Sequence, residues 1–221
     1  MSKDRANLLS YLFIVAVVGA AAWLYPALPD PVPVHWNIRG EADGWMAKPW
    51  GVAMLPAFPV FMFVVMRLIP VISPKGFRTD SFAGVFHILQ VALVGFGSLV
   101  GILALLQASG RDVPLNQVIF AALGLLFMVL GNYFGKIRKN FFMGIRTPWT
   151  LASDEVWART HRLGGWLFVL MGAILFAGAF FTITPGWLLG MVLLVALVPM
   201  IYSYFIYRRV EGFGPDEEDG G

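Results

Sequence analysis

A short polar segment between two apolar stretches holds side chains that could bind a ligand. Val32–Trp45 reads "VPVHWNIRGEADGW". An imidazole, an amide and a carboxylate supply hydrogen-bond donors and acceptors, and indole rings settle at membrane–water interfaces. The candidate recognition residues are His35, Trp36, Asn37, Asp43 and Trp45. We expect the first four of these to lie close together in an ordered loop, with Gly40 and Gly44 in turns.

The same segment has a second interpretation, a structural cap in which His35 and Asp43 satisfy backbone groups and the indoles anchor the loop. A metal site is disfavoured, because metal sites need several convergent ligands and this segment has a single His.

A longer polar segment, Gly135–Leu163, reads "GKIRKNFFMGIRTPWTLASDEVWARTHRL". Ser153 is a typical N-cap, and it predicts an amphipathic helix that ends near Leu163 and bends at the following glycines. The guanidinium of Arg146 could bind a carboxylate, with Asp154 and Glu155 nearby in sequence. The candidate residues for docking a partner are Asn140, Arg146, Thr147, Trp149, Trp157 and His161. The alternative is that this segment lies on the membrane and that these residues only fold it.

Six continuous apolar stretches flank these polar segments. A membrane-spanning helix needs about 20 predominantly apolar residues. The chain of 221 residues is 58% hydrophobic and 13% charged, and its mean hydropathy is +0.74. An all-α bundle of six transmembrane helices follows, with a structured outer loop and an inner amphipathic helix. The stretches are Leu8–Tyr25, Trp50–Ile69, Phe82–Gln107, Leu115–Phe134, Gly164–Thr182 and Trp187–Tyr207.

A few polar residues fall inside these stretches, where they usually face a bundle interior or a wet cavity. Arg67, His87 and Asn132, together with Gln90, could form a shallow vestibule beneath the inner segment. The alternative is that Arg67 snorkels to the membrane surface and Asn132 bonds a backbone carbonyl.

The arrangement of basic residues predicts the orientation. If the N-terminus is cytoplasmic, 13 of the 16 Lys and Arg residues face the cytoplasm, and only Arg39, Lys48 and Arg111 lie outside. The positive-inside rule therefore places both termini in the cytoplasm. The first stretch could instead be a signal peptide, which would leave the rest of the topology unchanged.

Four regions follow from these patterns. Residues 1–72 form a two-helix unit with the outer loop, 73–134 the next two helices, 135–210 the inner segment with the last two helices, and 211–221 an acidic, disordered tail. The chain has no cysteine, and no nucleophile lies beside a base in the apolar stretches. We expect no enzyme, no cofactor and no metal.

The two polar segments resemble a known family. "LPDPVPVHWNIRGEADGWMAK" (Leu28–Lys48) is similar to the outer-loop motif of a bacterial membrane domain without assigned function. "GNYFGKIRKNFFMGIRTPWTLASDEVWARTHRLGG" (Gly131–Gly165) is similar to the signature of the SdpI family. Together the two motifs cover about a quarter of the chain.

The resemblance implies a polytopic inner-membrane protein that gives immunity against a secreted sporulation-delay toxin. It also implies signalling, in which the toxin-engaged protein retains an ArsR-like repressor at the membrane. The expected partners are therefore membrane lipids, a peptide toxin outside and a repressor inside, with no direct contact to nucleic acid. The alternative is a small-molecule or peptide transporter, because proline and glycine would allow its helices to bend.

Overall fold

The computed structural model describes the whole chain except residues 38, 76, 78, 182–184 and 213–221. Six of its helices are long and apolar enough to cross a membrane. They are α1 (Lys3–Leu24), α2 (Lys48–Ile72), α3 (Ala83–Ala108), α4 (Leu115–Phe134), α6 (Asp154–Gly178) and α7 (Pro185–Val210). The predicted all-α membrane bundle is confirmed. The predicted disordered tail lies largely outside the described residues.

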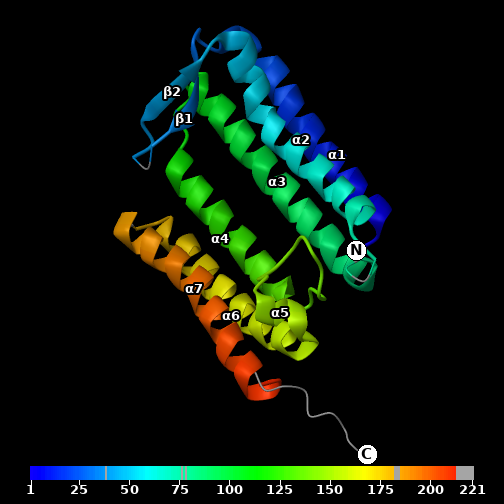
Figure 1. Cartoon of the computed structure of the whole chain (residues 1–221). Helices are drawn as coiled ribbons and strands as arrows, with labels where there is room; N and C mark the ends of the chain where they lie inside the picture. The colour runs from blue at the N-terminus through cyan, green and yellow to red at the C-terminus, as the bar shows by residue number, and fades with distance from the viewer. Residues whose placement is uncertain (38, 76, 78, 182–184, 213–221) are drawn as a thin grey trace, which may run out of the picture.

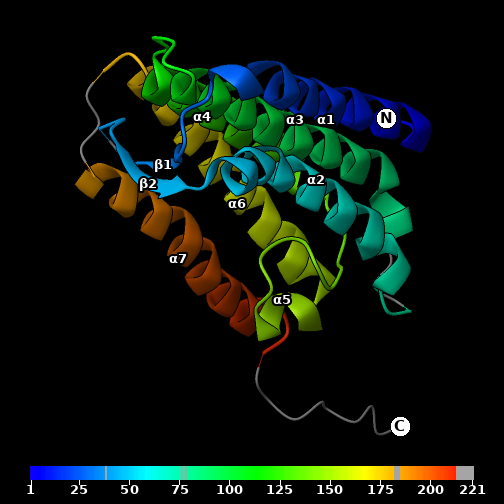
Figure 2. The same ribbon diagram turned by 90° about the horizontal axis from the view of Figure 1, so that it is seen from above.

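Shorter elements connect the long helices. They are the 3-10 turns η1 (Tyr25–Ala27) and η2 (Thr79–Phe82), the helix α5 (Pro148–Ala152) and the strands β1 (Val32–Trp36) and β2 (Ala42–Met46). The strands form an antiparallel hairpin that the sequence did not predict, because its prolines indicated an extended chain and its glycines indicated turns, without showing that the two segments pair. This hairpin lies at one end of the bundle, while α1 begins and α7 ends at the other end, where α5 packs against α6 and α7 (Figures 1 and 2).

Two predicted helix boundaries were wrong. Pro70 does not end α2, which continues to Ile72, since proline is tolerated in membrane helices. Gly164 and Gly165 do not bend the chain, because α6 runs unbroken from Asp154 to Gly178. The predicted amphipathic helix is therefore the first part of the fifth span and not a separate element.

The bundle has two parts. Helices α1, α2 and α3 pack together beneath the hairpin, while α4, α6 and α7 form a second group that joins the first where α3 packs on α4 (Figure 1). At the end near α5, a shared apolar cluster also connects the two parts, with Met66 and Phe86 on one side and Ile137 and Trp157 on the other.

The most extensive helix pair is α4 with α6, and glycine makes it possible. A Cβ on Gly131 would lie 2.6 Å from the Gly165 carbonyl oxygen, and one on Gly124 would lie 2.6 Å from that of Gly172. The contacts are reciprocal, and both glycine pairs recur seven residues apart on each helix. Close backbone approach through small residues is typical of membrane helix pairs, where apolar burial alone gives little drive to associate.

We therefore expect Gly131→Ala to destabilise the protein by about 1–3 kcal/mol, because the added methyl overpacks the interface. Thermal unfolding of the purified protein in detergent measures this change. Gly190→Ala on α7 is the matched control, since no heavy atom lies within 4 Å of its Cβ position. Equal losses in the two variants would show that the close approach contributes nothing.

Candidate functional site

The outer hairpin presents the predicted recognition residues at the surface. His35 Nδ1 and Asp43 Oδ1 form a hydrogen bond of 2.5 Å across the two strands, with side chains 71% and 44% exposed. The expected proximity of His35 and Asp43 is confirmed, although they bond to each other and not to the backbone. Gly44 lies in β2 and not in a turn, and it faces His35, where a Cβ would come within 2.9 Å of His35 Cβ.

Asn37 organises the tip of the hairpin. Its Oδ1 accepts hydrogen bonds from the backbone N–H groups of Arg39 and Glu41, and its Nδ2 donates to the Glu41 carboxylate at 2.9 Å. Gly40 completes the turn with a positive φ of 80°. The Asn37 amide, and then Arg39, hold the pKa of the exposed Glu41 carboxyl below its usual value. The side-chain bonds of Asn37 thus go to the tip and not to His35.

The two predicted hairpin tryptophans differ in their surroundings. Trp36 is half-buried and packs on the apolar cluster formed by α1, α2 and α3. Trp45 on β2 is 57% exposed, and Trp23 and Trp50 are more exposed still. Trp36 therefore anchors the hairpin, while Trp45 is available for contact with a membrane surface or a partner.

The inner loop between α4 and α6 is folded by buried polar side chains. Asn140 is fully buried and makes four hydrogen bonds, accepting from the N–H groups of Phe142 and Met143 and donating to the carbonyls of Arg138 and Met143. Asn140 therefore satisfies the backbone in a bend of the loop.

His161 fastens this loop to α6. Its Nε2 accepts a hydrogen bond from the Ile145 N–H at 3.0 Å, and its Nδ1 donates to the Trp157 carbonyl at 2.8 Å. Its ring stacks on Trp157, whose indole N–H donates to the Ile137 carbonyl. The Gly144 backbone has a positive φ of 107° and lies so close to the His161 ring that a Cβ there would overlap Nε2. Trp157, His161 and Gly164 share one face of α6, and all three are buried.

Thr147 fastens the loop to α7. It caps α5 through a reciprocal bond with Thr150, and its hydroxyl lies 3.0 Å from the Ser203 hydroxyl. Trp149 packs edge-on against Tyr204 in the same region. Ser203 and Gly144 were not predicted, since a lone serine or glycine in an apolar or irregular stretch gives no signal of its partner.

The prediction that Arg146 binds a carboxylate was wrong. Its Nη1 donates to the Phe141 carbonyl at 2.6 Å, whereas Asp154 pairs with Lys139 and Glu155 with Arg159. Of the six predicted docking residues, Arg146 is exposed, Trp149 is half-buried and the other four are buried. Those four form the interior of the loop, and Arg146 and its exposed neighbours lie at its surface.

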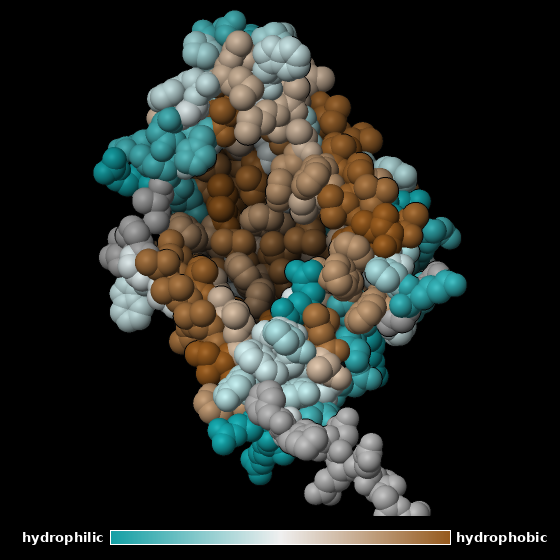
Figure 3. All heavy atoms as spheres, viewed as in Figure 1, coloured by the Kyte–Doolittle hydropathy of each residue, from teal (hydrophilic) through white to brown (hydrophobic). Residues whose placement is uncertain are grey.

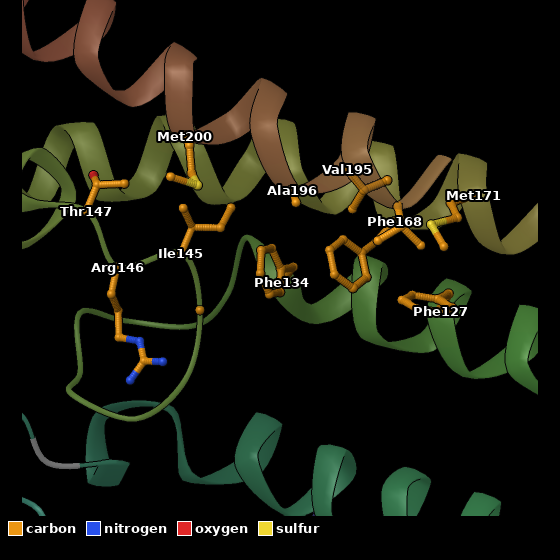
Figure 4. Close-up of a pocket in the computed structure, with 12 residues that line it drawn as sticks. Phe127, Phe134, Ile145, Arg146, Thr147, Phe168, Met171, Val195, Ala196 and Met200 are labelled. Atoms are coloured by element: carbon orange, nitrogen blue, oxygen red, sulfur yellow. The ribbon is translucent and has the colours of Figure 1, made fainter. Parts of the chain in front are cut away.

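An apolar groove of about 510 Å³ lies behind this loop, between α4, α6 and α7. It belongs to a broad hydrophobic hollow on one face of the molecule (Figure 3). Phe127, Phe134 and Phe168 face Val195 and Met200 across the groove, with Ile145 at one end (Figure 4). Its polar lining residues are Arg146 and Thr147. The groove can hold an apolar chain, and these two residues provide no acid–base pair.

The membrane-depth polar residues gather only in part. Arg67, His87 and Gln90 line a second pocket between α1, α2 and α3, together with Lys3 and Asp80. The predicted vestibule is therefore misplaced, since its lining comes from the first three helices and not from the inner loop. Asn132 is exposed on α4 and does not line it. Among the described residues, no group of three or more His, Asp or Glu could hold a metal ion.

Comparisons with known proteins match both polar regions. Residues 136–203 match the model of the SdpI/YfhL protein family, and residues 12–59 match a domain of unknown function, DUF1648. The chain is 22% identical to the immunity protein SdpI of Bacillus subtilis (strain 168) over 210 residues, which are 94% of this chain and 99% of that protein. No solved structure matches.

The fold and the two structured loops define a multi-pass helical membrane protein. The order of the two matched regions and the end-to-end alignment identify the family more closely. The chain belongs to the SdpI family.

The buried role of His161 leads to a prediction for stability. We expect His161→Leu to destabilise the protein by about 1–3 kcal/mol, because the Ile145 N–H loses its acceptor inside the fold. Thermal unfolding in detergent measures the loss. Arg159→Ala on the same helix is the control, since its half-exposed pair with Glu155 contributes about 1 kcal/mol at most. A stable His161→Leu variant would rule out a fastening role.

Proposed function

We propose that this protein protects its cell from a secreted peptide toxin. The observation that carries the proposal is the similarity to an immunity protein along almost the whole of both chains. In the proposed orientation, the membrane is the bacterial cell membrane, both termini are cytoplasmic and the hairpin faces outward. This orientation rests on the distribution of basic residues.

The outer hairpin is the proposed toxin-contacting surface. It presents the exposed His35–Asp43 pair, the Arg39–Glu41 pair and the exposed Trp45 on a short two-stranded sheet. Rigid aromatic side chains supply contact area at little entropic cost, and paired charges set register and specificity. The half-buried Trp36 holds this surface on the helices beneath it.

Complementation tests the proposal. In a Bacillus subtilis strain that lacks its immunity protein SdpI, the wild-type chain is expected to restore survival against the sporulation-delay toxin. Trp45→Ala and His35→Ala are expected to lower survival at least tenfold, equivalent to about 1.4 kcal/mol of lost binding, at unchanged protein abundance.

Trp166→Ala is the matched control for this experiment, because Trp166 is also an exposed tryptophan but lies on α6. It is expected to leave survival intact. Failure of the wild-type chain to protect would contradict the immunity proposal itself. If both hairpin variants still protect the cell, the toxin does not contact the hairpin and must contact another surface of the protein.

A second proposed activity is retention of an ArsR-like repressor at the inner loop. The supporting observation is a basic surface at this end of the bundle, formed by the exposed side chains of Lys136, Arg138 and Arg146. Internal hydrogen bonds hold the loop that carries them. Basic side chains on an ordered frame can bind acidic groups of a protein partner and fix its orientation.

Arg146→Ala is expected to release a fluorescently tagged repressor from the membrane, while protein abundance and toxin survival are unchanged. Arg209→Ala, an exposed arginine at the same end on α7, is the control and is expected to retain it. A reporter fused after Lys139 must read cytoplasmic. An external reading, or retention in the Arg146 variant, would contradict this activity.

A further inference from the structure

A polar pocket of about 290 Å³ near the start of α1 has no role in the proposed immunity function. It lies between α1, α2, η2 and α3, and two of its lining side chains, Lys3 and Arg67, are basic. His87 and the buried Gln90 line it from α3. Asp80 is the one acidic residue in this lining.

Lys3 and Arg67 outnumber the single acidic residue in the lining of this pocket. Among the ion pairs between described residues, none involves Lys3 or Arg67. The N-terminal ammonium of Met1 lies close by, 3.4 Å from the Gly84 carbonyl oxygen, and His87 Nδ1 donates to the Met1 carbonyl at 3.2 Å. The pocket therefore attracts an anion.

Hydrogen bonds between α3 and α1 position the beginning of α1. Gln90 Nε2 on α3 donates to Ser10 Oγ at 3.1 Å and to Asn7 Oδ1 at 3.4 Å, both on α1. The Ser10 hydroxyl in turn donates to the Ala6 carbonyl at 2.8 Å. These bonds fix the beginning of α1, and with it Lys3, against the helix that carries His87.

The pocket adjoins the lipid-facing surface. Arg67 is on a membrane-spanning helix, five residues before its end at Ile72. Val64, Leu68 and Val71 on the same helix are 46%, 49% and 78% exposed and recur at helical spacing beside it. A ligand that fills the pocket from this side has an anionic group with an apolar chain attached.

We propose that this pocket binds the phosphate of an anionic membrane phospholipid. Arg67 and Lys3 recognise the phosphate, since a guanidinium donates two parallel hydrogen bonds to its oxygens. The Val64–Val71 stripe of α2 carries an acyl chain. An anionic headgroup is preferred to a choline headgroup, because choline adds a positive charge beside two cations. This assignment is independent of toxin immunity.

Native mass spectrometry of the purified full-length protein tests the assignment, with phosphatidylglycerol and phosphatidylcholine of identical acyl chains as probes. The wild type is expected to bind phosphatidylglycerol more tightly. Arg67→Gln and Lys3→Gln are each expected to weaken this binding roughly fivefold, and the double variant about 25-fold, from about 1 kcal/mol per basic residue. Lys75→Gln, an exposed lysine outside the pocket, is the control and is expected to bind as the wild type does.

Three results would overturn the assignment. They are unchanged phosphatidylglycerol binding in the double variant, an equal loss in Lys75→Gln, and displacement of the lipid by excess inorganic phosphate, which would indicate a site for free anions. If Arg67→Gln does not fold, the exposed Lys3 still gives a decisive single variant, and no loss of lipid binding in it contradicts the proposal.

Discussion

Helices α4 and α6 approach each other at two glycine pairs so closely that no side chain fits between their backbones. In a lipid environment, burying apolar side chains gives little drive for two helices to associate, because lipid chains are equally apolar. Close backbone contact supplies dispersion and weak Cα–H···O attraction instead. The inner loop depends on this contact, since it leaves the end of α4 and returns to the beginning of α6. The groove depends on it too, because its phenylalanines come from both helices.

Buried hydrogen bonds supply the remaining specificity between elements. Gln90 connects α3 to α1, Thr147 connects α5 to Ser203 of α7, and His161 connects α6 to the loop backbone. Each of these side chains is nearly or fully buried, where competing water is excluded. Such bonds have strict geometry, so they select one arrangement of helices that apolar contacts alone would leave undetermined.

The two loops use polar residues in opposite ways. In the outer hairpin, the His35–Asp43 and Arg39–Glu41 pairs are on the surface, and the apolar Val32 and half-buried Trp36 hold the strands on the helices. In the inner loop, Asn140, Thr147 and His161 are inside, and the basic side chains around them are left at the surface. The hairpin therefore presents its polar side chains to the surroundings. The inner loop uses its uncharged polar side chains to fold the backbone and leaves its basic side chains at the surface.

The sequence by itself determined the six spans, the ordered outer loop and the side-chain bonds of Asn140, because hydropathy, turn residues and local reach are properties of neighbouring residues. The sequence did not predict the close approach of Gly124 and Gly131 to Gly172 and Gly165, because spacing within one helix does not reveal its partner helix. Only the tertiary structure decided that Trp157 and His161 are buried, that Arg146 bonds a carbonyl and not a carboxylate, and that Arg67 and Lys3 share a pocket. These outcomes depend on which helices lie side by side, and residues 64 positions apart meet only when packing brings their helices together.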